Sequence, residues 1–152
     1  MIRVVVVDGF SSGKFLAKKL YENECALFHV VSSSDLDGYY YVGFDSSIYE
    51  RSLVHTDTTF TLAELRHFNP DVIIAGAESG VLLADLLNEQ LGLDYANEFF
   101  RSRARRNKYE MIQCVTEAGL SAPAQCAVDT WSDGKDWVAA HGRFPLVVKP
   151  LE

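Results

Sequence analysis

The chain has 152 residues, of which 48% are hydrophobic and 23% are charged, and its formal net charge is −7. This length suits one domain, or one domain with part of another, and the composition lacks the low hydrophobicity typical of disordered chains. The acidic excess argues against a polyanion such as DNA as a partner, and no apolar stretch approaches the roughly 20 residues that span a bilayer.

Cys25, Cys114 and Cys126 form no paired or metal-ligand spacing, and their odd number does not suit a disulfide framework. They are predicted to be buried free thiols in a reducing compartment. The N-terminal valine run ends at Asp8 without the layout of a signal peptide. A cytoplasmic location is therefore expected.

The first 31 residues show the pattern of one βαβ unit. Residues 2–7 are apolar nearly throughout, which predicts a strand buried on both faces of a parallel sheet. A turn at residues 8–13 is followed by a predicted helix at 14–22 and a second strand at 27–31. The crossover between the two strands should be right-handed.

Residues 32–94 continue this alternation after a weaker stretch. The pattern favours a short strand at 39–43 and an irregular or edge segment at 49–55. Thr61 and Glu64 have the spacing of a capping box, which predicts a helix from 61 to 68, and residues 71–75 form another buried strand. A helix at 81–91 should end at Gly92. Residues 1–96 are therefore expected to form one α/β domain, a Rossmann-like open parallel sheet of roughly four strands.

Residues 97–152 form a second region, which holds eight basic and seven acidic residues against six and fourteen in residues 1–96. A linker helix is predicted at 97–106, then a helix with Asn107 as its N-cap and Gly119 at its end. A strand at 125–128, a helix at 132–141 and a strand at 144–149 follow, so this region should be a partial α+β subdomain. The basic run at 101–108 is either a solvated helix face or a binding surface.

Two turns of the first domain are candidate sites, because open α/β sheets bind ligands at the carboxyl ends of their strands. The turn from Gly9 to Lys14 resembles a phosphate loop, but it has three residues between its glycines where four are needed, and Phe15 follows the lysine. These glycines either permit a tight turn or, together with Ser11 and Ser12, contact a substrate.

Glu78 and Ser79 belong to the second turn, between the predicted strand at 71–75 and the predicted helix at 81–91. Glu78 either stabilises the N-terminus of this helix or, with Ser79 beside it, contacts an ammonium group of a substrate. The four histidines share no spacing and receive no role, and no metal site is predicted within the chain.

Lys108 and Lys149 are the strongest candidates for binding an anion. Lys149 ends an apolar strand pattern, where an unpaired ammonium group would be costly to bury. Lys108 lies in the first turn of a predicted helix, where the helix dipole disfavours a cation. Both positions favour a bound phosphate, and the alternative is two independent surface lysines.

The residues around these lysines resemble the ATP-grasp superfamily of carboxylate–amine ligases. Three segments carry the likeness: Arg106-Asn107-Lys108-Tyr109-x-Met111, Glu117 to Pro123, and Phe144 to Pro150. The segment Gly76 to Val81 and the acidic first half are similar to the pre-ATP-grasp domain of that superfamily. The branch that contains bacterial L-amino acid ligases is the most similar, and the likeness covers nearly all of the chain.

This resemblance implies that Lys108 and Lys149 contact the phosphates of ATP. It also implies an enzyme that uses ATP and Mg²⁺ to convert a carboxylate into an acyl-phosphate, which an amine then attacks. Asn107 departs from the aspartate of many members, although it caps a helix equally well. The glycine-rich loop, the metal-binding acids and the adenine pocket are expected beyond residue 152, so the chain should be an N-terminal fragment that is inactive alone.

Two other functions remain possible from the sequence. A non-catalytic Rossmann-like binding or interaction domain would need none of the missing catalytic acids. A nicotinamide-dependent enzyme is disfavoured because the glycine fingerprint of such enzymes is missing. Pairing of an unfinished ATP-binding lobe with a second copy would give a homodimer, and neither a nucleic acid nor a membrane is an expected partner.

Overall fold

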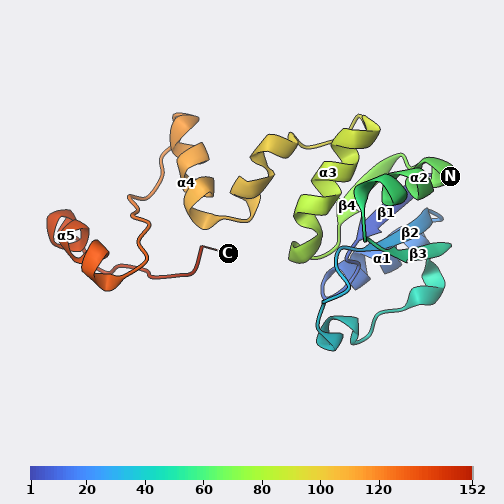
Figure 1. Ribbon diagram of the computed structural model, residues 1–152, viewed down its shortest axis with the longest axis horizontal. Helices are drawn as coiled ribbons and strands as arrows, with labels where there is room; N and C mark the ends of the chain where they lie inside the picture. Colours follow the sequence, from blue (N-terminus) through green and yellow to red (C-terminus); the bar gives the residue numbers. More distant parts are fainter. Residues whose placement is uncertain (152) are drawn as a thin grey trace. The chain divides into compact units, whose positions relative to one another are not determined.

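The computed structural model describes residues 1–151, and the chain divides into two compact units, Met1–Ser102 and Arg103–Glu152. The first unit contains a sheet of four strands, labelled in Figure 1: β1 (Arg3–Val7), β2 (Ala26–Val31), β3 (Arg51–Val54) and β4 (Val72–Ala75). Their order is β3-β2-β1-β4, and every neighbouring pair is parallel. The predicted α/β fold with about four parallel strands is therefore confirmed.

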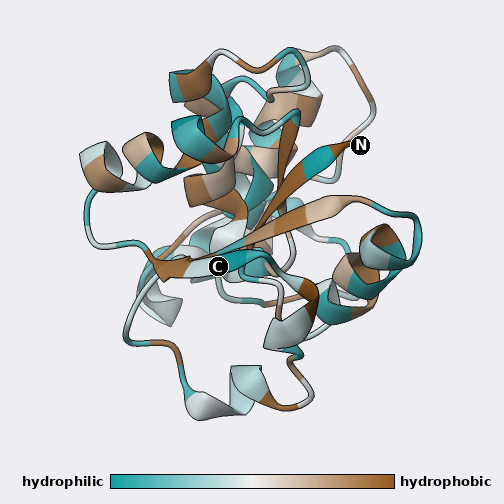
Figure 2. Ribbon diagram, turned by 90° about the vertical axis from the view of Figure 1, so that its right-hand side faces the viewer, coloured by the Kyte–Doolittle hydropathy of each residue, from teal (hydrophilic) through white to brown (hydrophobic). Residues whose placement is uncertain are grey.

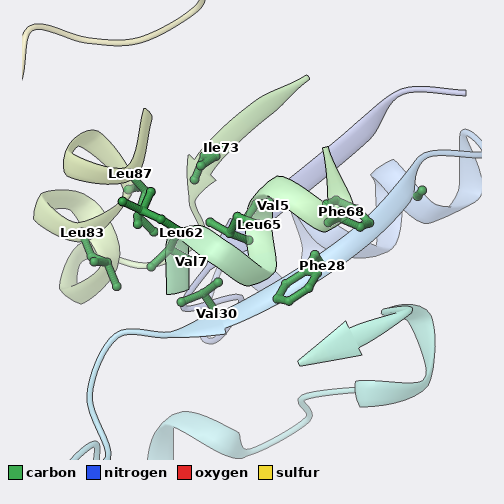
Figure 3. Packing of buried hydrophobic residues seen from close by; sticks show 12 residues of the cluster. Val5, Val7, Phe28, Val30, Leu62, Leu65, Phe68, Ile73, Leu83 and Leu87 are labelled. Carbon is green, nitrogen blue, oxygen red and sulfur yellow. The ribbon is translucent and has the colours of Figure 1, made fainter. Parts of the chain in front are cut away.

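Helices cover both faces of this sheet. On one face the core contains side chains of α2 (Thr58–Phe68) and α3 (Val81–Leu91) packed against alternate residues of β1, β2 and β4 (Figure 3). On the other face Ala17 of α1 (Gly13–Glu22) lies in a second cluster with Val4, Val6, Leu27 and Tyr49. Because side chains alternate along a strand, β1 and β2 are buried on both faces, and β1 is mostly brown in Figure 2.

Two predictions between residues 32 and 68 need correction. Helix α2 begins at Thr58 because Asp57, rather than Thr61, is its N-cap, and Asp57 accepts a hydrogen bond from Phe60 N at 2.8 Å. Residues Gly38–Tyr41 form a 3₁₀ helix, η1, where a short strand was predicted. The segment at 49–55, predicted as irregular or an edge, contains β3, which pairs with β2 alone and is an edge strand of the sheet, so the second alternative is confirmed.

The second unit contains two α-helices, α4 (Lys108–Glu117) and α5 (Trp131–His141), and the predicted linker helix is the 3₁₀ helix η4 (Phe99–Arg105). The predicted cap of α4 is confirmed, since Asn107 Oδ1 accepts hydrogen bonds from the backbone N–H groups of Tyr109 and Glu110, both at 3.0 Å.

The strands predicted at 125–128 and 144–149 do not form in residues 1–151. A strand needs a hydrogen-bonded neighbour, and the described residues offer these two segments none. Val147 and Val148 are 82% and 96% exposed as a result. The cysteines are free as predicted, although Cys114 and Cys126 are exposed rather than buried.

Candidate functional site

The carboxyl ends of β1 and β4 form the candidate site of the first unit. These strands are neighbours, and the helices that follow them, α1 and α3, lie in the cores of opposite faces. In open α/β sheets such a switch point opens a crevice that holds ligands. The two turns at this point contain all five residues predicted to contact a substrate: Gly9, Ser11, Ser12, Glu78 and Ser79.

Glycines allow the two turns to touch backbone to backbone. A Cβ atom at Gly13 would lie 2.4 Å from the carbonyl oxygen of Gly76, and one at Gly76 would lie 2.7 Å from the carbonyl oxygen of Asp8. Real Cβ atoms do not approach backbone atoms this closely. This packing requires glycine at positions 13 and 76 whether or not a ligand binds at the turn.

Asp8 connects three elements at this edge of the sheet and was not singled out from the sequence. Its buried carboxylate accepts hydrogen bonds from Ser32 N at 2.7 Å and from the hydroxyl groups of Ser32 and Ser79, both at 2.6 Å. Ser32 follows β2, and Ser79 lies in the 3₁₀ helix η3 (Glu78–Gly80). A polar residue directly after a buried valine run was the available signal for this role.

The five predicted residues differ in what they offer to a ligand. Ser79 donates its hydroxyl to Asp8, so it holds the turn in place. Ser11 and Ser12 are exposed, and neither side chain forms a hydrogen bond within residues 1–151. Glu78, in the second turn, is also exposed. A carboxylate and two hydroxyl groups at one sheet edge can bind an ammonium group or a polyhydroxyl group.

The backbone of the first turn is also unusual. Asp8 and Ser11 adopt left-handed conformations, with φ angles of 54° and 48°. Such conformations are unfavourable for residues other than glycine, and they persist where the surrounding contacts hold them. The hydrogen bonds of Asp8 supply those contacts, so the turn presents Ser11 and Ser12 in a fixed backbone geometry.

His29 lies beneath this turn and is a structural residue. Gly9 N donates a hydrogen bond to Nε2 at 3.1 Å, so the proton is on Nδ1, which lies 3.0 Å from the Ser52 hydroxyl oxygen. Burial lowers the pKa of His29 to about 4, against the opposing effect of the nearby Asp8 charge. Both ring nitrogens are used inside the protein, so His29 is not placed to exchange protons with a ligand.

Lys108 and Lys149 both lie in the second unit. The Lys108 backbone N–H donates to Leu151 O at 2.8 Å and its Nζ lies 3.3 Å from the same oxygen, so the start of α4 lies against the segment that follows Lys149. Lys149 is exposed. Neither lysine forms an ion pair with a carboxylate of residues 1–151. Both ammonium groups can therefore receive an anion.

The neighbouring basic run is partly neutralised. Arg101 forms an ion pair with Glu98 and Arg103 forms one with Glu110, both at 3.0 Å. These contacts fit the solvated helix face that was one of the two alternatives for the run.

Within residues 1–151 no three histidine, cysteine or acidic side chains lie together as a metal-ligand set. No helix in that range is long and apolar enough to cross a membrane.

Comparisons with known proteins agree with this picture. Dapdiamide A synthase of Enterobacter agglomerans is 32% identical over 152 residues, which cover 98% of this chain and 36% of that protein. The crystal structure of the L-amino acid ligase from Bacillus licheniformis matches with a TM-score of 0.64 and 14% identity, over 90% of this chain and 33% of that one. At this identity the second match shows the fold alone. No protein-family model matches the chain.

The chain thus spans about a third of the length of these two relatives. Dapdiamide A synthase is an ATP-grasp ligase, and its similarity extends through both units of this chain. The predicted resemblance to the ATP-grasp carboxylate–amine ligases is therefore confirmed.

Proposed function

We propose that this chain is the N-terminal part of an ATP-dependent ligase that joins a carboxylate to an amine, with amino acids as substrates. The observation that carries the proposal is the 32% identity with dapdiamide A synthase over nearly the whole chain. The fold shared with an L-amino acid ligase supports it. In this proposal residues 1–96 are the pre-ATP-grasp domain, and residues 97–152 are a linker helix and the first part of the ATP-grasp domain. The cytoplasm, which holds ATP and keeps thiols reduced, is the proposed location.

Lys108 and Lys149 are proposed to contact the phosphates of ATP. Their ammonium groups have no carboxylate partner within residues 1–151, and the hydrogen bond from Lys108 N to Leu151 O holds their two segments together. ATP supplies the phosphoryl group that turns a carboxylate into an acyl-phosphate for attack by an amine. The lysines would bind and orient the phosphates, each through charge-assisted hydrogen bonds.

Magnesium is proposed to accompany ATP in the whole enzyme, with its ligands outside this chain. The described residues form no metal-ligand set, so they do not fit this ion by themselves.

The substrate is proposed to contact the edge of the sheet at Gly9, Ser11, Ser12, Glu78 and Ser79. There the exposed Glu78 can pair with an ammonium group, while Asp8 fixes Ser79 and its turn.

Replacement of Lys149 by alanine in the whole ligase tests the phosphate role. ATP turnover dependent on amino acids should fall about 10- to 100-fold, since a charge-assisted hydrogen bond contributes about 1.5–3 kcal/mol. Release of inorganic phosphate is the measurement. Lys135→Ala, on the exposed side of α5, is the matched control and should keep full turnover.

Normal turnover by a folded Lys149→Ala ligase would remove the phosphate role. If the whole protein showed no ATP turnover with any pair of amino acids, a non-catalytic binding domain would explain the chain better than a ligase.

A further inference from the structure

The first unit contains a hollow that shares only Gly9 with the proposed substrate site. It has a volume of about 390 Å³ and lies between α1 and residues 43–49, with Gly9 also in its lining. Ser11, Ser12, Glu78 and Ser79 do not line it. This volume lies within the range of about 300–1,000 Å³ that is usual for small-molecule pockets.

Tyr49 supplies a polar group to this hollow that lacks a partner. The residue is 8% exposed, and its ring lies 5.0 Å from that of His29 and 5.7 Å from that of Phe44. Its hydroxyl oxygen packs against Gly9, where a Cβ atom would lie 2.3 Å from it. Within residues 1–151 this buried hydroxyl has no hydrogen-bond partner. A buried hydroxyl without a partner costs free energy, which an acceptor atom from a ligand would recover.

The charges around the hollow favour an anion. Lys14 and Lys18 lie one helical turn apart on α1 and both line it. Lys14 Nζ donates to the backbone oxygen of Val42 at 3.0 Å, and neither lysine is ion-paired with a carboxylate of residues 1–151. Glu22 also lines the hollow, but it forms an ion pair with Lys19 at 2.7 Å.

Asp45 is the opposing carboxylate in this lining, and it already accepts hydrogen bonds from the backbone N–H and the hydroxyl of Ser47, at 2.9 and 2.6 Å. Burial raises the pKa of Tyr49 to about 12, with Asp45 adding to the effect, so its hydroxyl keeps its proton and remains a donor. Neither ammonium group forms an ion pair with a carboxylate of residues 1–151. Lys18 nevertheless lies near enough to Asp45 and Glu22 for its charge to help lower their pKa values, after the larger effects of Ser47 on Asp45 and of Lys19 on Glu22.

The remaining walls are apolar and largely aromatic. Phe15 and Tyr21 of α1 line the hollow although they are 68% and 53% exposed. Phe44 and Ile48 form the facing wall. Such walls suit the hydrocarbon part of a ligand, while the hydroxyl and ammonium donors suit an acceptor that carries negative charge.

We propose that this hollow, named here the α1 cleft, binds a small carboxylate with an apolar body. One carboxylate oxygen accepts a hydrogen bond from Tyr49, and the negative charge lies near Lys14 and Lys18. Since the Tyr49 hydroxyl is buried in the free protein, binding shifts the side chains that cover it. The inference does not depend on ligase activity, because it concerns a site that this chain forms by itself.

Titration of the ¹⁵N-labelled chain with phenylacetate, followed by NMR, tests the proposal. The amide signals of Gly9 and Gly43 should shift and saturate. Phenylacetamide, which has the same body without the charge, should bind more weakly, and phenethylamine, which carries the opposite charge, should not shift these signals. Equal affinity for all three probes, or no shift of these amides up to the solubility limit of phenylacetate, would overturn the proposal.

Variants separate binding from folding. Tyr49→Phe should bind phenylacetate about tenfold more weakly, since it removes a hydrogen bond to a charged group. Its unfolding midpoint in urea should not fall, because the variant also removes an unpartnered buried hydroxyl. Tyr39→Phe removes an 80% exposed hydroxyl outside the cleft and should bind as the original chain does. Unchanged affinity in a folded Tyr49→Phe chain would contradict the assigned contact.

Discussion

Single residues at the carboxyl edge of the sheet hold the candidate site in place. The Asp8 carboxylate joins Ser32 and Ser79, and His29 accepts the backbone N–H of Gly9. Removal of one side chain from a buried hydrogen-bond network is costly, because its partners are then buried without a hydrogen bond and cannot reach water. The exposed Ser11, Ser12 and Glu78, which are proposed to contact a substrate, therefore lie in turns that buried neighbours hold in place.

The pKa of His29 predicts how stability should depend on pH. Between pH 6.5 and about 4 the unfolded chain binds a proton at this residue and the folded chain does not. The contribution of His29 to the free energy of unfolding should therefore be fully present above pH 6.5. It should decrease as the pH falls towards 4, by at most roughly 3 kcal/mol. Urea unfolding across this range is the measurement.

His29→Gln keeps a hydrogen-bond acceptor near Gly9 N without the titration, so it should lose less stability on acidification. His67→Gln, at an exposed position on α2, should retain the slope of the original chain. An equal slope in the His29 variant and the original chain would show that other groups cause the acid sensitivity.

At the scale of elements, the continuous apolar runs of β1, β2 and β4 were sufficient to predict the buried strands, and the turns at the carboxyl ends of β1 and β4 were predicted as candidate sites. Strand β3 has the sequence Arg-Ser-Leu-Val and lacks such a run, so the local pattern left an irregular segment and an edge strand as alternatives. The strands expected after α4 failed because pairing depends on a partner that a local pattern cannot provide.

The same limit applies to the sites. Gly9, Ser11, Ser12, Glu78 and Ser79 follow strands directly, so topology alone could place them at one edge. The contact between Tyr49 and Gly9 joins residues forty positions apart, and nothing in either neighbourhood predicts it. The role of Asp8 likewise depends on two hydroxyl groups that only the folded chain brings to it.

Contact between the two turns predicts a large effect for one added methyl group. Gly76→Ala places a Cβ atom 2.7 Å from Asp8 O and 2.8 Å from Gly9 Cα, and these backbone atoms cannot move without disturbing β1. The free energy of unfolding should fall by about 1–3 kcal/mol, as for other overpacked sites.

Gly38→Ala is the matched control, because no atom lies within 4 Å of its added Cβ atom. Urea unfolding should find it within about 0.5 kcal/mol of the original chain. If the two variants were equally stable, the turns would not be packed as the structure describes.

At the scale of the whole molecule, the two units differ in how much apolar surface they bury. Every hydrophobic residue that is buried within residues 1–151 lies in the first unit. Folding stability comes mainly from such burial, so amides of β1, β2 and β4 should exchange with solvent more slowly than those of α4 and α5. Since the first unit contains this buried core, we expect it to fold as a separate fragment.

A truncation series tests where this first unit ends. The Asp85 carboxyl group is 2% exposed and accepts hydrogen bonds from Asn97 Nδ2 at 3.1 Å and the Ser102 hydroxyl at 2.5 Å. A fragment of residues 1–102 keeps both partners, whereas residues 1–96 lose them. The shorter fragment should be less stable by about 1–3 kcal/mol in thermal or urea unfolding.

Ser102→Ala in the complete chain removes one of these donors without a change of length, and it should show part of the same loss. Equal stability of the two fragments would place the end of the domain at residue 96, before the 3₁₀ helix η4.

The backbone contact between the turns also limits which substitutions the candidate site can accept. Positions 13, 76 and 80 admit no side chain, because a Cβ atom at each would lie 2.4–2.7 Å from a backbone oxygen. Substitutions that change the proposed substrate contacts without loss of the fold are therefore best made at the exposed residues Ser11, Ser12 and Glu78. A library that varies these three positions would test the proposed substrate contacts and leave the packed glycines unchanged.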